Sequence, residues 1–401
     1  IVLYANKETL VAKLLSYKFF VGIGLISYSA YLWHQPLFAF ARILLIEHPS
    51  SALMLTLSII SIFMAYFSWK YVEKPFRNFE KVSRIQISVI SLIGVMFFLS
   101  IGLFGNFNSK NLERDWLSRQ TLSVQNMYEL INKSHPLIDN WGASGENIQE
   151  ITECIFNIRE INQQVQDRIL ECRKQHGKGL LVLGDSHAID LFGVIASRRD
   201  RPFLIGITQG DCRPHNNHEH CHYDRVLDFI NSHLGTFSLV IYEQAGFYLL
   251  RKQDGTKGSR SMFSELAVDQ AVSNLTVDEE RIRLTAEYLY ALSEVVKVNW
   301  FLPRVEPHIP TTLVLTRGCD YNYSYRPNLY ETFNGLDSYI TNFVKKNFAS
   351  RINVISQNKM LGFELPRDFM SCEEIYWSDG DHLSAHGEEY FGKRITSELF
   401  E

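Results

Sequence analysis

The apolar residues of this chain are concentrated in three long runs before residue 105. The runs cover residues 19–46, 52–69 and 85–105, and the second and third contain no charged residue. A helix needs about 20 mainly apolar residues to cross roughly 30 Å of hydrocarbon. Buried helices of a soluble domain are the alternative, but runs without a polar face favour the bilayer. The pattern therefore predicts three transmembrane helices within residues 1–105.

Farther along the chain, short apolar runs alternate with amphipathic helical segments. Predicted strands cover residues 180–183, 203–207, 238–242 and 352–355. Predicted helices cover residues 188–197, 278–298, 330–348 and 384–399. This alternation is typical of α/β proteins with a mainly parallel sheet between two helical layers, a three-layer α/β/α domain. We assign this domain to residues 151–401.

Residues 106–150 are polar and irregular between these two parts. They contain one predicted helix at 112–132 and a loop at 141–145. We interpret them as a linker or extension that joins the α/β domain to the membrane part.

Basic residues predict which side of the membrane each part occupies. Three lysines precede the first run, five Lys or Arg residues lie between the second and third, and residues 47–51 have none. Cytoplasmic loops carry the excess of Lys and Arg, so the third helix runs outward and the α/β domain lies outside the cytoplasm. The net charge of −4, without blocks of like charge, gives no sign of nucleic-acid binding.

The chain begins at Ile1, without an initiator Met or a signal peptide. We expect it to be the C-terminal part of a longer protein.

All six cysteines follow residue 150, as an oxidising compartment would permit. Proximity suggests three disulfides among 15 possible connectivities. The suggested pairs are Cys154 with Cys172, Cys212 with Cys221, and Cys319 with Cys372. An alternative for the second pair is a zinc site with nearby histidines, namely His215, His218, His220 and His222.

His34 is an ionisable residue inside the first apolar run, which suggests a function. A plainer interpretation is that it satisfies backbone groups freed by Pro36 near the membrane interface. Both stay open, and a direct catalytic role is the weaker of the functional ones.

Two motifs of the α/β domain predict nucleophilic catalysis. Ser186, in the run Gly-Asp-Ser-His at 184–187, follows a buried strand and begins a helix. That position directs its hydroxyl to the carboxyl edge of a parallel sheet, where the helix N-terminus favours an oxyanion. An ordinary helix cap is the alternative.

The second motif, Asp379-Gly-Asp-His382, precedes the last predicted helix. Asp379 can orient the imidazole of His382 through Nδ1–H, which leaves Nε2 free to take a proton from serine. Asp381 is the weaker candidate for this role. A solvated turn is the alternative for this motif alone, but the two motifs together predict a Ser-His-Asp triad.

Several motifs resemble known families. The runs SYSAYLWHQP at 27–36 and WKYVEKPFR at 69–77 resemble late-helix segments of the acyltransferase-3 family of membrane proteins. The two motifs of the α/β domain resemble those of the SGNH hydrolase superfamily. The order of the two parts is similar to that of bacterial O-antigen and peptidoglycan O-acetyltransferases.

The resemblance implies Ser186 as nucleophile, His382 as base and Asp379 as orienting acid. It also implies further helices before Ile1, with that family's own catalytic His and Arg. Its oxyanion hole would use the N–H of Ser186 and of Gly210, and an Asn after the third strand. This chain has Gln244 near that place, which departs from the family and leaves the third donor in doubt.

The implied activity is O-acylation, with acetyl as the expected acyl group, of a cell-surface glycan such as lipopolysaccharide O-antigen or peptidoglycan. Acetyl-CoA would supply the membrane part on the cytoplasmic side of a bacterial inner membrane. No cofactor is expected to bind this part of the protein. Four tyrosines offer rings for sugar stacking or for packing: Tyr321, Tyr323, Tyr325 and Tyr330.

Two other functions fit the same residues. An extracytoplasmic carbohydrate esterase would use the same triad with water as the acceptor. A membrane-anchored glycan-binding module would need neither the serine nor the histidine.

Overall fold

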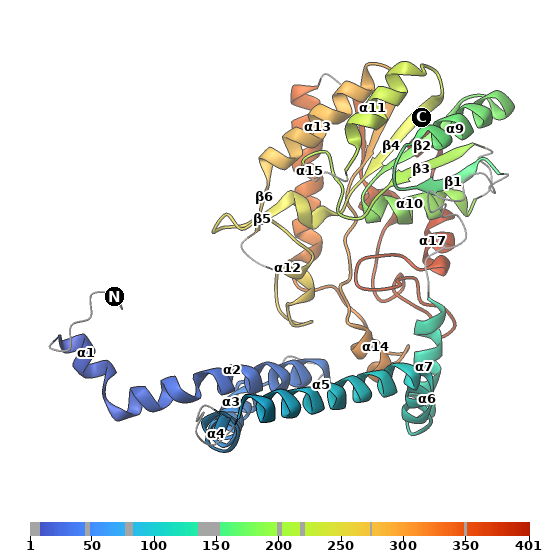
Figure 1. Cartoon of the computed structure of the whole chain (residues 1–401). Coiled ribbons are helices and arrows are strands. Elements are labelled where there is room, and N and C mark those ends of the chain that lie inside the picture. The colour runs from blue at the N-terminus through green and yellow to red at the C-terminus, as the bar shows by residue number, and fades with distance from the viewer. Residues whose placement is uncertain are drawn as a thin grey trace. The chain divides into compact units, whose positions relative to one another are not determined.

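A computed structural model describes most of the chain, which divides into two compact units, Ile1–Gln120 and Thr121–Glu401 (Figure 1). The described residues are 9–44, 49–76, 83–134, 153–198, 203–216, 221–272, 275–348 and 351–401. The predicted loop at 141–145 and the histidines at 218 and 220 lie outside them. The predicted limits at residues 105 and 150 stay predictions.

The described part of the first unit is helical. Its helices are α1 (Leu10–Leu15), α2 (Lys18–Leu44), α3 (Ser51–Ser68), α4 (Lys74–Phe76), α5 (Arg84–Phe107) and α6 (Ser109–Ser118), with a π-helical turn at Trp69–Glu73. Ser50 caps α3 by accepting from the N–H of Leu53. Ser83 and Gln86 form a reciprocal capping box at the start of α5. These caps satisfy N–H groups that have no partner within the helix, so both starts are encoded locally.

Two stretches of helix are long and apolar enough to cross a membrane, Ser51–Phe76 and Arg84–Phe107. They match the second and third predicted spans. The first predicted span lies in α2, which is long enough but is less apolar than the other two. The polar residues of 27–35, including Tyr28, His34 and Gln35, dilute its apolar character. By this measure the described residues supply two candidate spans, where the sequence predicts three.

A six-stranded parallel sheet forms the centre of the second unit. Its strands are β1 (Ile155–Ile158), β2 (Gly179–Gly184), β3 (Leu204–Thr208), β4 (Phe237–Glu243), β7 (Lys297–Phe301) and β8 (Ile352–Ile355). Their order is β1-β3-β2-β4-β7-β8, and each neighbouring pair is parallel. A separate antiparallel pair joins β5 (Leu250–Lys252) and β6 (Leu275–Val277). The prediction of an α/β fold with a mainly parallel sheet is confirmed.

The second unit has helices before β1, between the strands and after β8. They are α7 (Leu122–Lys133), α9 (Gln163–His176), α10 (Ser186–Ala196), α11 (Tyr223–Ser232), α12 (Ser261–Ser264), α13 (Glu279–Ser293), α14 (Thr311–Arg317), α15 (Leu329–Asn347), α16 (Gln357–Leu361) and α17 (Ala385–Gly392). Figure 1 shows α10 and α17 on one side of the sheet and α9, α11 and α13 on the other. Right-handed crossovers require this, because the chain moves in opposite directions after β2 and after β3. Ser186 therefore follows the strand at which the direction reverses, the usual place for a ligand crevice.

Three predicted helices have wrong limits. The helix predicted at 278–298 ends at Ser293, and β7 begins at Lys297. Val295, Val296 and Val298 continue the apolar pattern, but β-branched residues favour a strand. The predicted closing helix ends at Gly392, and a 3₁₀ turn (Ser397–Phe400) follows.

The helix predicted at 112–132 is two helices, α6 and α7. Thr121 starts the second by accepting from the N–H of Val124. A cap of this kind has extended backbone and cannot lie inside a helix, so it separates α6 from α7.

The three suggested disulfides are confirmed. Cys154–Cys172, Cys212–Cys221 and Cys319–Cys372 have S–S distances of 2.11, 2.08 and 1.96 Å. The second disulfide removes both thiolates from the suggested zinc site. His215 instead contacts the Thr285 hydroxyl at 3.1 Å, and His222 lies 3.6 Å from Glu160.

Candidate active site

Ser186 begins α10 immediately after β2, and the turn between them requires glycine. Gly184 has φ +152°, and a Cβ there would lie 1.8 Å from the carbonyl oxygen of Glu243. Asp185 caps α10 by accepting from the N–H of His187 at 3.0 Å. The first N–H groups of a helix have no intrahelical partner, so the N–H of Ser186 is available at this end.

The carboxylate of Asp185 joins the ends of three strands. It accepts from the backbone N–H of Ala245, after β4, at 3.1 Å and from Arg213, after β3, at 3.0 Å. Asp185 is fully buried, and Arg213 is 3% exposed. A buried carboxylate needs such donors to offset its lost hydration. The group next to the candidate nucleophile is therefore held from both neighbouring strands.

Asp379 and His382 form the predicted hydrogen-bonded pair. The imidazole Nδ1 lies 3.0 Å from Oδ2 of Asp379, and Oδ1 accepts from the N–H of His382 at 2.8 Å and of Asp381 at 3.0 Å. The turn thus fixes the carboxylate before the imidazole binds it. With Nδ1 donating to Asp379, Nε2 is the nitrogen that can accept a proton.

The pair shifts the pKa of both groups. Burial lowers the pKa of His382, but the hydrogen bond that His382 donates to Asp379 and the charges of Asp190, Asp379 and Asp381 outweigh it and raise the pKa to about 9. Burial raises the pKa of Asp379, but the hydrogen bond and charge of His382 and two backbone N–H groups hold it well below its usual range. His382 must lose its proton to act as a base, so base catalysis should increase with pH up to about 9.

The His382 loop packs against the start of α10. The rings of His382 and His187 lie 5.3 Å apart, and the N–H of Leu383 donates to Asp190 at 3.0 Å. Nε2 of His382 is buried and has no hydrogen-bond partner among the described residues. Ser186 and His382 form no hydrogen bond with each other, although catalytic hydrogen bonds often tighten only when substrate binds. The loop and the serine therefore meet at one edge of the sheet.

Asp381 occupies a different position from Asp379. Its Oδ1 lies 3.6 Å from Nδ1 of His382, and Arg260 binds the same oxygen at 2.5 Å. Its Oδ2 lies 3.7 Å from His187. Asp379 is thus the closer partner of the imidazole.

The three candidate oxyanion donors follow three neighbouring strands. Gly184 pairs in register with Thr208 and with Glu243, which places Ser186, Gly210 and Gln244 at one edge. Gly210 lies in an exposed turn, and a side chain there would meet nothing within 4 Å. Gln244 is buried, its Oε1 accepts from the Tyr242 hydroxyl at 2.6 Å, and its Nε2 has no partner among the described residues. The amide nitrogen of Gln244 is therefore available as a donor.

A buried arginine that the sequence did not point to ties the site together. Arg304, after β7, is 1% exposed and pairs with Asp190 on α10 and with Glu243 at 3.0 Å. It also donates to the carbonyl oxygen of Asp381 at 2.9 Å. Burial outweighs the charge of Arg304 and raises the pKa of Glu243 to about 8 and that of Asp190 to about 6. Arg304 thus links the helix of Ser186 to the loop of His382.

The residues that follow Arg304 form a second buried group. His308 contacts Glu306 at 2.8 Å, and the other oxygen of Glu306 lies 3.5 Å from Nδ1 of His187. Burial lowers the pKa of His308 to about 3 and raises that of Glu306 well above its usual value. Burial is also the main cause that lowers the pKa of His187 well below its usual value. His308 has φ +46° and donates its N–H to the carbonyl of Gly380 at 2.7 Å. This strained residue therefore buttresses the turn between Asp379 and Asp381.

Ligand atoms of His187, Asp381 and His382 lie within 4.8 Å of one another, close enough to share a cation. Asp379 already binds His382, and Arg260 already binds Asp381. A metal ion would have to compete with both, so this donor set fits a cation poorly.

His34 lies in α2 of the first unit. Its Nδ1 is 3.1 Å from the carbonyl of Ala30, and its ring contacts Tyr31 and Phe38. Pro36 would leave the carbonyl of Leu32 without its usual donor, so His34 satisfies a different backbone group from the one proline frees.

Of the four tyrosines proposed for sugar stacking, Tyr323 is 1% exposed and donates to the carbonyl of Gly318 at 2.7 Å. Tyr321 is 39% exposed and packs edge-on against Tyr323. Tyr325 and Tyr330 pack against each other at 6.2 Å. Packing accounts for Tyr323, and the guanidinium of Arg317 lies over the ring of Tyr321 at 5.4 Å, so one face of that ring is occupied.

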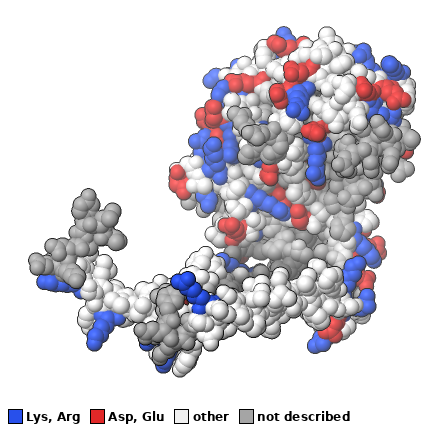
Figure 2. Space-filling view, viewed as in Figure 1, with Lys and Arg blue, Asp and Glu red and all other residues white. Residues whose placement is uncertain are grey.

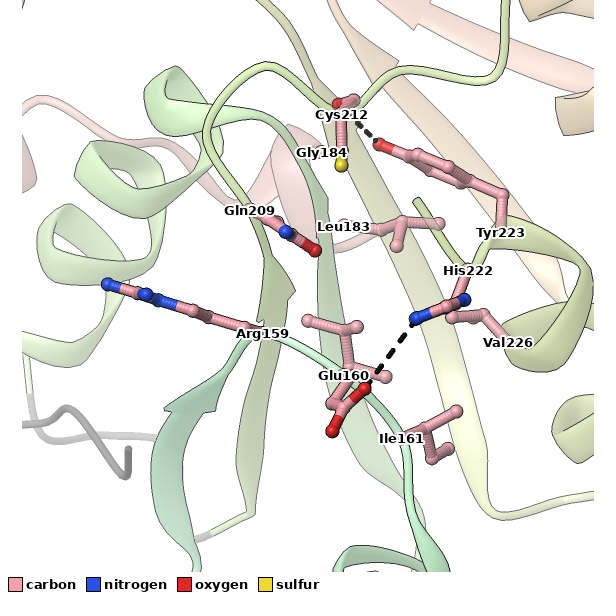
Figure 3. A pocket seen from close by; sticks show the side chains of 11 residues that line it. Arg159, Glu160, Ile161, Leu183, Gly184, Gln209, Cys212, His222, Tyr223 and Val226 are labelled. Carbon is pink, nitrogen blue, oxygen red and sulfur yellow. Dashed lines mark hydrogen bonds and ion pairs between the residues drawn. The ribbon is translucent and has the colours of Figure 1, made fainter. Parts of the chain in front are cut away.

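Figure 3 shows a narrow crevice beside β2 and β3, lined by Leu183, Gly184 and Gln209. Its volume of about 20 Å³ is close to the space one water molecule needs. His222 and Glu160 approach across its mouth at 3.6 Å, and Tyr223 donates to the carbonyl of Cys212 at 3.0 Å. The crevice is too small for a sugar ring.

Comparison with known proteins does not identify a family for this chain. No family model matches the sequence, and no curated protein matches it. One similar solved structure is described as "a putative platelet activating factor from Streptococcus pneumonia". It is 10% identical, with a TM-score of 0.33 over 59% of this chain and 92% of that chain.

Proposed function

We propose that the second unit transfers acyl groups through an ester on Ser186. The observation that carries the proposal is the state of His382. Its Nδ1 is bound by Asp379, while its Nε2 is buried, has no partner among the described residues, and lies in a loop packed on the helix that begins with Ser186. An imidazole held in this way serves as a general base for a neighbouring hydroxyl.

In the first step Ser186 Oγ attacks the acyl carbonyl while its proton moves to Nε2 of His382. The bond to the leaving group breaks, the leaving group takes that proton, and an acyl ester remains on Ser186. A sugar hydroxyl then attacks the ester and gives its proton to His382. The acylated sugar departs, and the proton returns to Ser186 Oγ.

The negative oxygen formed in each step needs donors. We assign the N–H groups of Ser186 and Gly210 and the side-chain amide of Gln244, which follow three neighbouring strands. Loss of one such donor costs about 10²–10³ in rate in a serine hydrolase.

The proposal extends to the first unit, which we interpret as the end of a membrane domain in a bacterial cytoplasmic membrane. Two apolar helices, the basic loops and three disulfides confined to the second unit support this arrangement. The membrane domain would receive acetyl groups from acetyl-CoA on the cytoplasmic side. The acceptor would be a surface glycan outside, either O-antigen or peptidoglycan.

The test uses the full chain in detergent with p-nitrophenyl acetate, with and without a glycan acceptor. Nitrophenol release that requires Ser186, rises with glycan and leaves acetylated sugar would support the transferase. Release that ignores the glycan and ends as free acetate would favour the carbohydrate esterase. Equal release by the Ser186→Ala variant would contradict both and leave a glycan-binding module as the better description.

A further inference from the structure

The second unit contains a hollow much larger than the crevice beside β2. Its volume is about 600 Å³, within the range of small-molecule sites. It lies between the loop after β3, the segment around β5, and the start of α13. Its lining is mostly polar or charged: Asp211, Arg213, His215, Asn216, Tyr248, Arg251, Gly255, Lys257, Asp278, Glu280, Arg281 and Leu284.

This hollow borders the candidate active site. Asp211 and Arg213 directly follow Gly210, and Arg213 donates to Asp185 at 3.0 Å. Tyr248 stacks on the guanidinium of Arg213 at 3.4 Å. The residue before it, Phe247, contacts the ring of His187 at 6.0 Å. Both walls therefore connect within a few residues to the turn that holds Ser186.

One end of the hollow carries an excess of positive charge. Arg251 and Arg281 share a single carboxylate, Asp278, at 2.9 and 3.8 Å. Lys257 is exposed and makes no ion pair with the described residues. Figure 2 shows basic side chains gathered on the flank where Figure 1 draws β5 and β6. Because Arg283 binds the carboxylate of Glu280 at 2.7 Å, two positive charges remain unbalanced at this end.

The half-buried imidazole of His215 is affected by the same positive charges. Burial and, to a lesser extent, the charges of Arg213, Arg281 and Lys257 lower its pKa to about 3. His215 is therefore neutral at physiological pH and adds hydrogen-bonding groups without adding charge.

The lining near Gly210 adds hydrogen-bonding groups. Tyr248 donates its hydroxyl to Asp211 at 3.0 Å, and Asn216 donates to the backbone carbonyl of Asp211 at 2.8 Å. Asp211 is exposed, so its carboxylate can also accept from a ligand hydroxyl. The hollow therefore offers both hydrogen-bond acceptors and cations to a ligand.

We propose that this hollow binds the acceptor glycan and selects a saccharide that carries a carboxylate or a phosphate. The anionic group lies against Lys257, Arg251 and Arg281, and sugar hydroxyls face Asp211 and the catalytic edge. This assignment rests on the proposed acyl transfer for its acceptor role. The binding itself requires no catalysis.

The test measures binding and transfer separately on the full chain in detergent. Ligand-observed NMR gives dissociation constants for D-glucuronate, glucose 6-phosphate and glucose, in the Ser186→Ala background so that no turnover occurs. The variants are Lys257→Gln and, as the matched control, Lys252→Gln on β5, an exposed lysine that does not line the hollow. Acetylated sugar is measured in the chain with Ser186 intact.

We expect at least one of the two anionic sugars to bind more tightly than glucose. Lys257→Gln should weaken that sugar about threefold to fivefold, as for a partly exposed ion pair, and Lys252→Gln should leave it unchanged. The preferred anion then distinguishes carboxylate from phosphate, and added salt should reduce the preference.

Equal binding of all three sugars, or equal effects of the two lysine variants, would overturn the assignment even if acetyl transfer occurs. Lysine-dependent binding without any acetyl transfer would support the site and contradict the proposed reaction.

Discussion

The two units differ in the burial of their large apolar side chains, which are mostly exposed in the first unit and mostly buried in the second. In α5 none of the described residues is buried, and Ile93 and Phe98 are 62% and 73% exposed. Among the residues of α2 and α3 whose burial is described, the buried ones are small: Ser29, Ser61 and Ala65. Small residues at helix contacts with large apolar ones outside are typical of helices that face lipid.

The second unit has the ordinary arrangement of a protein in water. Its largest apolar side chains are buried, Phe192 and Trp300 among them. Figure 2 shows charged side chains spread over the visible face of this unit and a long uncharged surface along the helices of the first. Large apolar side chains are therefore exposed in one unit and buried in the other, which indicates that the two units have different surroundings. The proposed chemistry belongs to the unit that has a packed core to position the residues involved.

The sharpest test of that division is Asp379→Asn in the second unit against His34→Ala in the first. Asparagine keeps the shape of the turn but favours the wrong tautomer of His382, so turnover of p-nitrophenyl acetate should fall about 10⁴-fold. His34→Ala should leave this turnover unchanged, because His34 lies in the other unit. A large loss in His34→Ala would break the division of roles.

A second test removes one phenylalanine from each unit. Phe192→Ala in α10 should lower the free energy of unfolding of the second unit by about 3–5 kcal/mol, because it opens a cavity in a packed core. Phe98→Ala in α5 has no such core to disturb and should leave the unfolding transition of the second unit in place. Denaturant unfolding followed by tryptophan fluorescence and near-UV circular dichroism measures both variants.

A third test replaces one exposed apolar residue in each unit by arginine. Ile93→Arg, near the middle of α5, should make membrane insertion less favourable by about 2.5–3.5 kcal/mol. Leu234→Arg, at a position 59% exposed in the second unit, should change its stability by less than about 0.5 kcal/mol. Membrane fractionation with a glycosylation reporter after α5 measures insertion. Unimpaired insertion of Ile93→Arg would argue against the bilayer as the surroundings of α5.

The last test concerns the pH dependence of the second unit. Turnover of p-nitrophenyl acetate, corrected at each pH for Ser186→Ala, should rise up to tenfold per pH unit and level off near the pKa of His382, about 9. Asp379→Asn removes a negative charge that favours protonated His382, so its residual activity should level off at a lower pH. A flat profile between pH 6 and 9 would show that His382 does not act as the base.

Much of the second unit could be predicted from local patterns. The strands at β2, β3, β4 and β8 are short apolar runs, and the three disulfides join cysteines that follow one another in the sequence. Asp379 and His382 are three residues apart, so the turn alone brings them together. In most of these cases the partners are close in the chain, and Cys319 and Cys372, 53 residues apart, are the exception.

The prediction failed where one apolar pattern ran into the next. The valines that follow α13 extended the predicted helix to residue 298 and hid β7. Because β7 was not predicted, the sequence could not assign Arg304, Glu306 and His308 to the edge of the sheet. A buried strand followed by three ionisable residues is the signal that could have found them.

The sequence by itself determined the alternation of strands and helices, the position of Ser186 at a strand–helix turn, the Asp379–His382 pair, and where the uncharged runs lie. These features depend on side-chain periodicity and on partners a few residues apart. Only the tertiary structure decided that Arg304 joins Asp190, Glu243 and Asp381, and that Arg213 holds Asp185. Such contacts join segments up to 114 residues apart, and their geometry depends on strand order and packing that no local pattern encodes.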